Sequence, residues 1–410
     1  MEYLHVEVNT SQLPKRAGQP SGDVVRVVRS PGWTTVICCD GMGSGIKANV
    51  AATLHSSRLL ELEKQGVSLR DAFARVVGSI HQDRGKTPMY AAMAVARILH
   101  SGEATVLTYD MPAPIFAGAM HASLLTQRLF HADAALLGEC YCHLSAGEGI
   151  CLMSDGITQA GIGTQFRDGW GDEQAARYLD TLLGRKCTLD RIPGELTERA
   201  RQLWCESRGE RPSSARPKPS REGLETLSGF PSQQQRLGDD CTAVFAHCRP
   251  GKQLSILTGP PYRPTADREF VERFLATSGW KVVCGATTSK IVARHLGKEL
   301  GMDQDVSLIA PPSYRIEGID LVTEGAVTLT QVYNILEEDP SRYEEWSGVT
   351  ELCDLLRAAD RIHFFVGTAN NPGNLSIAFQ QKGILPRTRT VPLIRERLTK
   401  AGKLVVVDMA

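Results

Sequence analysis

The sequence lacks any stretch that approaches the roughly 20 consecutive apolar residues needed to span a bilayer. It also lacks an excess of charge of either sign, because Lys+Arg and Asp+Glu both total 46. A balanced chain gives no reason to expect general binding to nucleic acid or to an anionic membrane. The first residues carry acids early and are typical of a strand, not of a signal peptide. We therefore expect a cytoplasmic protein.

Paired cysteine and histidine motifs are missing as well. The 11 cysteines form no paired CxxC zinc pattern, and the 10 histidines show no HxxxH or HExxH spacing. Cys38 and Cys39 are adjacent within an apolar run, which favours a position in the core of a strand. Buried, reduced thiols in a cytosolic protein are the expected state.

The length of 410 residues is too great for one compact core, so we expect two domains. Residues 1–248 alternate short β-rich runs with a few helices, and residues 249–410 alternate apolar strands with helices. The second pattern predicts a doubly wound α/β domain with a mostly parallel sheet. Residues 207–236 are rich in Ser, Pro, Arg and Glu and poor in large apolar groups, which predicts a mobile surface insertion in the first domain.

The elements of the first domain follow from local composition. Two helices are expected, over Gly45–Gln65, where Ile46, Val50 and Leu54 mark one apolar face, and over Met89–His100. Short runs rich in Val, Ile, Thr or aromatic residues predict strands. These runs are Tyr3–Val8, Val24–Arg29, Trp33–Cys39, Glu103–Tyr109, Pro114–Ala117, Gly149–Met153 and Thr242–His247.

Three aspartates stand at the ends of apolar runs in this domain. Asp40 lies in TTVICCDGMGSG, Asp155 in GICLMSDGITQAG and Asp239 in RLGDDCTAVFA, while Asp23 precedes a strand in PSGDVVRVV. A carboxylate at such a position is costly to bury unless a cation compensates it. Hard divalent ions bind carboxylate and carbonyl oxygens, so aspartates converging from separate strands predict a Mg²⁺ or Mn²⁺ site. Gly41 would let its backbone carbonyl approach such an ion.

Two simpler interpretations of these motifs stay open. Any single Asp-Gly at a strand end is usually a turn. The glycines Gly41, Gly43 and Gly45 also lead into a helix, as in a dinucleotide-binding loop. That interpretation is disfavoured because Asp40 would repel a pyrophosphate where the fingerprint requires glycine.

Taken together and in this order, the motifs SGD, DGMGSG, SDGI and GDDCT resemble those of the metal-dependent protein serine/threonine phosphatase family (PPM, type 2C), in its bacterial SpoIIE-like branch. The resemblance covers about residues 1–248. It implies an α+β fold, with a two-sheet antiparallel β-sandwich flanked by helices and two Mn²⁺ or Mg²⁺ ions at one edge.

The resemblance also implies a role for each acid. Asp40 would bridge both ions, the Gly41 carbonyl would bind one of them, and Asp155 and Asp239 would ligate the other. Asp23 would hold metal-bound water or complete the shell of the second ion. By the same resemblance Asp240 would point away from the ions, and Thr242 would support the strand.

The implied reaction is hydrolysis of phosphoserine or phosphothreonine on a bacterial signalling protein, such as an antagonist of an anti-sigma factor. Asp40, Asp155 and Asp239 would act through a metal-bridging hydroxide, and no phospho-cysteine or phospho-histidine intermediate is implied. Met42 stands where eukaryotic members carry His, so no side chain supplies the leaving-group proton at that position. The alternative function is a catalytically inactive phosphatase-fold scaffold or ligand-sensing module.

The sequence does not name a role for the C-terminal domain, which would sense a small molecule, recruit a partner or mediate dimerisation. Loops at expected strand ends are Gly285–Ser289, Thr323–Gly325 and Gly367–Asn371, an edge where open α/β sheets bind ligands. The simpler interpretation, which we favour, is that Thr288 or Ser289 is a helix N-cap. In the first domain, Arg84 and Lys86 fit either a phosphopeptide contact or a solvated basic turn.

Overall fold

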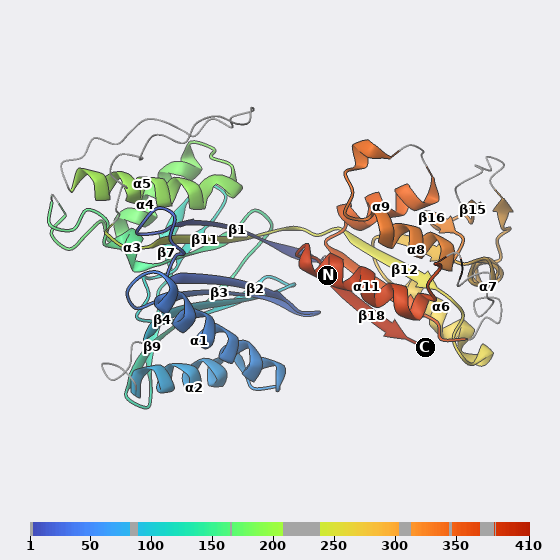
Figure 1. Cartoon of the computed structure of the whole chain (residues 1–410), viewed down its shortest axis with the longest axis horizontal. Helices are drawn as coiled ribbons and strands as arrows, with labels where there is room; N and C mark the ends of the chain where they lie inside the picture. The colour runs from blue at the N-terminus through green and yellow to red at the C-terminus, as the bar shows by residue number, and fades with distance from the viewer. Residues whose placement is uncertain are drawn as a thin grey trace. The chain divides into compact units, whose positions relative to one another are not determined.

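The computed structural model describes residues 3–82, 89–164, 166–207, 238–302, 313–343, 347–369, 381 and 383–410. The predicted insertion beyond Ser207, the basic residues Arg84 and Lys86, and the loop end at Asn370 and Asn371 lie outside the described residues. The chain divides into two compact units, one formed by Val6–Arg249 and the other by Met1–His5 with Pro250–Ala410 (Figure 1). We call them the N-terminal and C-terminal domains.

Two antiparallel sheets form the centre of the N-terminal domain. The first has the strand order β2 (Asp23–Arg29), β3 (Trp33–Gly41), β4 (Ala91–Leu99), β5 (Glu103–Tyr109), β9 (Ala135–His143) and β8 (Arg128–Ala132). The second has the order β1 (Leu4–Leu13), β11 (Cys241–Pro250), β10 (Gly149–Met153), β6 (Ile115–Ala117) and β7 (Ala122–Leu124). Strands far apart in the sequence thus become neighbours, most notably β10 and β11.

Helices cover the outer face of each sheet (Figure 1). The helices α1 (Ile46–Lys64) and α2 (Leu69–Gln82) share a hydrophobic core with β3, β4 and β5. The helices α4 (Asp172–Gly184) and α5 (Ile192–Glu206) share another with β6, β10 and β11, beside the short α3 (Asp155–Thr158) and the 3₁₀ turn Leu189–Arg191. Two antiparallel sheets flanked by helices fit the α+β fold that the sequence predicts.

The predicted helix over Met89–His100 is wrong, because this segment forms strand β4. Its alanines favour a helix locally, which explains the error. β4 lies between β3 and β5 in the first sheet, and Met93, Ala94, Val95 and Ala96 are all buried. A strand buried on both faces has no polar alternation, so its period cannot distinguish it from a helix. Helix α2 was not anticipated.

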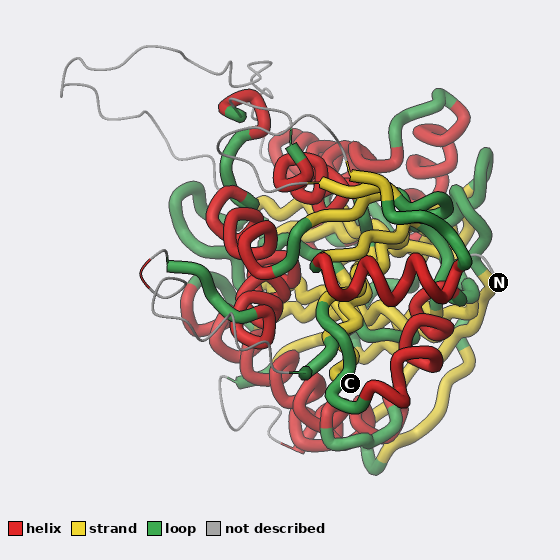
Figure 2. Tube along the Cα trace, turned by 90° about the vertical axis from the view of Figure 1, so that its right-hand side faces the viewer, coloured by secondary structure: helices red, strands yellow, loops and turns green. Residues whose placement is uncertain are grey.

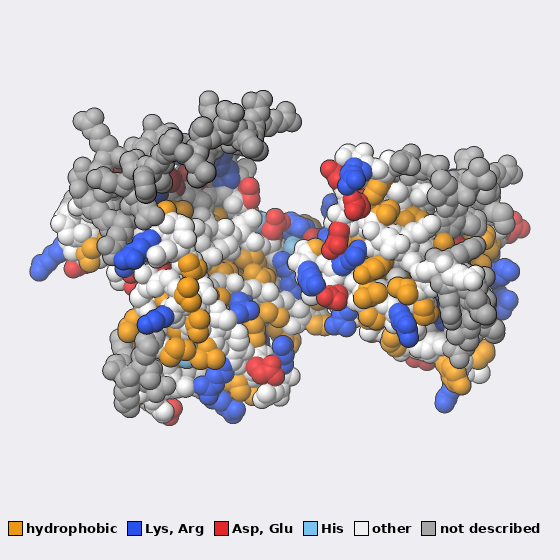
Figure 3. Space-filling view, in the orientation of Figure 1, with side chains coloured by type: hydrophobic (Ala, Val, Ile, Leu, Met, Phe, Trp, Pro, Cys, Tyr) orange, Lys and Arg blue, Asp and Glu red, His pale blue; other side chains and the backbone are white. Residues whose placement is uncertain are grey.

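The apolar face predicted for the first helix does exist, but it does not face the core. Ile46 is 71% exposed, and Val50 and Leu54 are each 51% exposed. Hydrophobic side chains gather over α1 on the surface (Figure 3). Most buried residues of α1 are small. The buried residues are Ala48, Ala51, Ala52, His55, Ser56 and Leu59. Small side chains let the helix approach β3 closely, so the larger ones remain outside.

The C-terminal domain contains one sheet of seven strands. Its order is β14 (Gly301–Met302), β15 (Ser313–Arg315), β16 (Leu321–Thr323), β13 (Trp280–Cys284), β12 (Gln253–Thr258), β17 (Arg361–Val366) and β18 (Leu404–Met409). The five strands from β16 to β18 in this order are mutually parallel, whereas β14 and β15 pair antiparallel.

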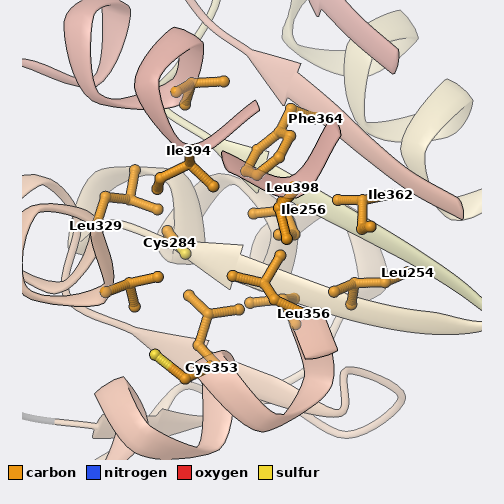
Figure 4. Packing of buried hydrophobic residues seen from close by; sticks show 14 of the residues in the cluster. Leu254, Ile256, Cys284, Leu329, Cys353, Leu356, Ile362, Phe364, Ile394 and Leu398 are labelled. Carbon is orange, nitrogen blue, oxygen red and sulfur yellow. The ribbon is translucent and has the colours of Figure 1, made fainter. Parts of the chain in front are cut away.

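Helices pack on both faces of this sheet. Figure 2 draws the helices in red and the strands in yellow. On one face α8 (Ala326–Ile335), α9 (Gly348–Ala358) and α11 (Arg387–Lys400) share a core with Ile256 and Phe364 (Figure 4). On the other, α6 (Asp267–Leu275) and α7 (Ala286–Leu296) pack against Leu257 and Phe365. Single 3₁₀ turns cover Pro264–Ala266 and Pro340–Arg342. No helix in the described parts of the chain is long and apolar enough to cross a membrane.

Candidate metal centre

Asp23 and Asp40 lie opposite each other on neighbouring strands. Asp23 begins β2, Asp40 is the penultimate residue of β3, and the antiparallel register pairs them directly. Asp23 is only 3% exposed. Directly opposed like charges are unfavourable in a sheet, so this pair is a costly feature that requires compensation.

Asp155 and Asp239 are placed by the second sheet. Asp155 follows β10 as the first residue of α3, and Asp239 precedes β11. The Ser154 and Thr242 backbones hold these strand ends together, since Ser154 N donates to Thr242 O at 2.9 Å and Thr242 N donates to Ser154 Oγ at 2.9 Å. Asp155 accepts a hydrogen bond from Gln159 Nε2 at 2.8 Å.

Polar contacts connect the two sheets at this edge. Gln12 Nε2, on β1, donates to Asp23 O and to Thr242 Oγ1, both at 3.2 Å. Gly22 N donates to Asp240 Oδ2 at 2.9 Å. These contacts bring the Asp23–Asp40 pair of one sheet beside the Asp155–Asp239 pair of the other.

Burial and mutual repulsion raise the pKa values of three of these acids. Burial raises the pKa of Asp23 to about 7, against the opposing effect of the Thr242 and Ser154 hydroxyls. Burial, followed by the charges of Asp23 and Asp155, raises the pKa of Asp40 well above its usual range. Burial also raises the pKa of Asp239, although the Lys15 ammonium opposes the shift. The four carboxyl groups therefore interact electrostatically.

The surroundings of the Asp23 carboxyl oxygens indicate whether a cation suits this edge of the two sheets. The Thr242 and Ser154 hydroxyls lie near enough to Asp23 to lower its pKa, but neither Oδ1 nor Oδ2 of Asp23 makes a hydrogen bond of normal geometry among the described residues. A buried carboxylate without partners is expensive, and a hard cation is the compensation that its chemistry favours. In the described ranges, no three His, Cys, Asp or Glu side chains already converge closely enough to hold an ion. Carboxylate oxygens are the donor type that Mg²⁺ and Mn²⁺ prefer.

The other predicted residues have different neighbours. Asp240 accepts backbone hydrogen bonds on both oxygens, from Lys15 N at 2.5 Å and from Gly22 N at 2.9 Å. A Cβ at Gly41 would lie 2.0 Å from Ala48 O, so α1 packing alone requires glycine there. Cys38 and Cys39 are fully buried in β3, and burial raises the pKa of both thiols.

Lys15 is a residue that sequence reasoning missed. Its Nζ lies 3.5 Å from Asp239 Oδ1, so a cation already stands beside one predicted ligand. No local pattern signals this role, because Lys15 is 224 positions from Asp239. Ser154 was also missed, although it directly precedes Asp155 in the SDGI motif and its hydroxyl accepts from Thr242 N.

Comparison with known families decides the assignment of this domain. Residues 30–212 match the family described as Stage II sporulation protein E (SpoIIE). This segment includes Asp40, Gly41 and Asp155 in their structural context on β3 and α3. Residues 30–212 of the N-terminal domain therefore form a SpoIIE-type segment.

Solved structures similar to this chain share little sequence with it. The RsbU and RsbW domains of a Mycobacterium tuberculosis protein are 15% identical, with 67% of this chain and 69% of that chain covered and a TM-score of 0.45. The PP2C phosphatase domain and a regulatory fragment of Bacillus subtilis SpoIIE are 16% identical, with 61% and 65% covered and a TM-score of 0.45. Similarities of this size do not establish an activity, substrate or partner. A comparison with curated proteins found no match.

An exposed apolar residue follows Asp40 closely in the sequence. Met42, two residues after Asp40, is 54% exposed and lies at the start of the exposed row that continues with Ile46, Val50 and Leu54. A thioether does not donate a proton at this position.

Proposed function

We propose that the N-terminal domain is a metal-dependent protein serine/threonine phosphatase acting on a phosphorylated signalling protein in the cytoplasm. The observation that supports it best is the meeting of two acid pairs from different sheets, with both oxygens of buried Asp23 unpartnered. Asp40, Asp155, Asp239, Asp23 and the Gly41 carbonyl would hold two Mn²⁺ or Mg²⁺ ions. Bound ions of this kind neutralise charge on phosphoryl oxygens and lower the pKa of water.

The chain's own residues supply position and rigidity. Ser154 and Thr242 fix the ends of β10 and β11, and therefore the spacing between Asp155 and Asp239. Asp240 ties the Lys15 and Gly22 backbones to the same edge. Lys15 Nζ beside Asp239 adds a positive charge that favours approach of a phosphate. The exposed Met42 leaves the leaving-group proton to solvent.

Hydrolysis of p-nitrophenyl phosphate tests the proposal. The wild-type chain should turn over this compound only when Mn²⁺ or Mg²⁺ is added, and Asp155→Ala should reduce kcat by about 10²–10³-fold or more, the scale of losing one preorganised electrostatic contact. Direct Mn²⁺ binding, measured by calorimetry, should weaken in parallel for Asp40→Asn.

Asp168→Ala is the matched control, because Asp168 is exposed and has no role in the site. It should keep wild-type turnover. A wild-type chain that binds Mn²⁺ but hydrolyses neither this compound nor any phosphopeptide would instead support the inactive scaffold. Failure to bind Mn²⁺ at all would refute both the metal centre and the phosphatase.

A further inference from the structure

The C-terminal domain contains a cavity at the carboxyl ends of its parallel strands. The cavity has a volume of about 290 Å³. The loops after β12, β13, β16 and β17 all contribute to it, through Gly259, Cys284–Thr288, Glu324–Ala326 and Ala369. Since β12 starts the domain and lies between β13 and β17, the chain reverses its winding direction there. Ligands of open α/β sheets bind at such a point.

Two helices begin at this cavity. α7 starts at Ala286 after Gly285, and α8 starts at Ala326 after Gly325. The two starts are close together, because a Cβ on Gly325 would lie 3.3 Å from the Gly285 Cα. No side chain caps α7, so its first amide groups have no acceptor among the described residues. Free amides and the helix dipole favour an anion at this position.

Thr288 provides an independent observation that points to a ligand. Its side chain lines the cavity although the residue is only 3% exposed. In the part of the chain that the structure describes, its hydroxyl makes no hydrogen bond; the Ser289 hydroxyl, by contrast, donates to Gly285 O at 2.9 Å. The hydroxyl is reachable from the cavity and can donate to a bound ligand. An oxyanion bound at the start of α7 would accept the hydrogen bond from Thr288.

Arg387 adds a fixed positive charge to the same cavity. Its Nε donates to Gly367 O at 2.7 Å and its Nη2 donates to Ala369 O at 2.5 Å. The guanidinium lies against the backbone of Gly259, where a Cβ would be 2.1 Å from Nε. No carboxylate of the described residues pairs with it, and burial lowers its pKa. A half-buried cation without a counter-ion among the described residues favours an anionic ligand.

Glu324 limits the class of ligand. It is the acidic residue among the cavity-lining residues that the structure describes, and its Oε2 accepts a hydrogen bond from Val327 N at 3.1 Å. Its second oxygen is available to accept from a hydroxyl group. The volume lies near the lower end of the range for small-molecule sites, which is roughly 300–1,000 Å³. A dinucleotide is too large for it.

We propose that the C-terminal domain binds a small phosphomonoester with hydroxyl groups, such as a sugar phosphate. The phosphate lies between the starts of α7 and α8, next to Thr288 and Arg387, and the hydroxyl groups face Glu324. This site is separate from the acid pairs of the N-terminal domain and does not depend on the proposed phosphatase activity.

Calorimetry with ribose 5-phosphate on the full chain tests this site. EDTA and an Asp155→Ala background prevent hydrolysis and binding at the N-terminal acids. We expect binding with one site per chain. Thr288→Val should weaken it about tenfold, the effect of one hydrogen bond to a charged group. Ala286→Asp should abolish it, since a carboxylate at the first helical position suits the helix but repels phosphate.

Thr277→Val is the matched control, because Thr277 bonds to Phe274 O at the end of α6 and does not line the cavity. It should leave the affinity unchanged, and circular dichroism should show that all variants fold. Binding that survives both Thr288→Val and Ala286→Asp would overturn the proposal. So would failure of ribose 5-phosphate, ribulose 5-phosphate and inorganic phosphate to bind at millimolar concentration, or tighter binding of succinate than of any phosphate.

Discussion

Two glycines at the proposed metal centre are fixed by close contacts of the backbone. A Cβ at Gly41 would lie 2.0 Å from Ala48 O, and a Cβ at Gly156 would lie 2.0 Å from Asp240 O. The sequence suggested that glycine after Asp40 serves the approach of an ion. The structure adds a second reason, because α1 passes directly over Gly41. Each glycine therefore fixes the position of the aspartate that precedes it.

Gly41→Ala should destabilise the N-terminal domain by about 1–3 kcal/mol, the usual cost of overpacking. The cause is the clash with Ala48 O, which must displace α1 or the end of β3 and with it Asp40. Urea unfolding of the variant gives the free energy. Gly194→Ala is the control, since no atom lies within 4 Å of its added Cβ and alanine favours helix α5. Equal stability of the two variants would contradict the packing described here.

At the scale of elements, helix α1 has two apolar faces, and only one of them packs on the core. The row Ile46, Val50 and Leu54 is exposed, whereas Leu59, later in the same helix, is fully buried. Hydrophobic periodicity alone identifies an apolar face but does not say what it contacts. The alanines that pack on β3 carry little hydrophobic signal, so the sequence pattern favoured the wrong face.

The pair Leu54 and Leu59 makes this difference measurable in a single helix. Leu59→Ala should cost about 2–5 kcal/mol because it leaves a cavity in the core. Leu54→Ala removes the same atoms from an exposed site and should stay within about 0.5 kcal/mol of the wild type. Chemical denaturation with a probe in the N-terminal domain measures both values. A larger loss for Leu54→Ala would show that the exposed row is covered in the native protein.

At the scale of the whole molecule, the chain contains two separate hydrophobic systems. The N-terminal cores combine residues of the two antiparallel sheets with α1, α2, α4 and α5. The C-terminal cores lie on the two faces of the parallel sheet. Units with their own cores can unfold independently, so a single melting temperature does not describe the chain.

Calorimetric unfolding of the full chain should therefore show two transitions that respond to different additions. Mn²⁺ at about 100 times its Kd should stabilise the N-terminal transition by about 2.7 kcal/mol and leave the other unchanged. Asp40→Asn should remove this effect. Leu356→Ala, at a fully buried position in α9, should lower only the C-terminal transition. If Mn²⁺ raised the temperature of the C-terminal transition instead, the main metal site would lie in the C-terminal domain and not at the four aspartates.

Local sequence patterns predicted most strands of the N-terminal domain but not all of its elements. β5 and β10 occupy the predicted residues Glu103–Tyr109 and Gly149–Met153, because turn residues bound each run. β4 was predicted as a helix, since its alanines have high helix propensity and only its place between β3 and β5 makes it a strand. The contact of Lys15 with Asp239 has no sequence signal, because it depends on β1 lying beside β11.

The sequence by itself determined the family of the N-terminal domain, because its acidic motifs carry their chemistry in residue type and order. Only the tertiary structure decided which oxygens remain free. Asp23 and Asp240 are both acids beside strands, yet the fold gives Asp240 two backbone donors and gives Asp23 none among the described residues. The cavity at Thr288 and Arg387 also follows only from the tertiary structure, because the parallel strands bring together loops that are distant in sequence. Residue types set the possible chemistry, and long-range pairing sets which groups meet.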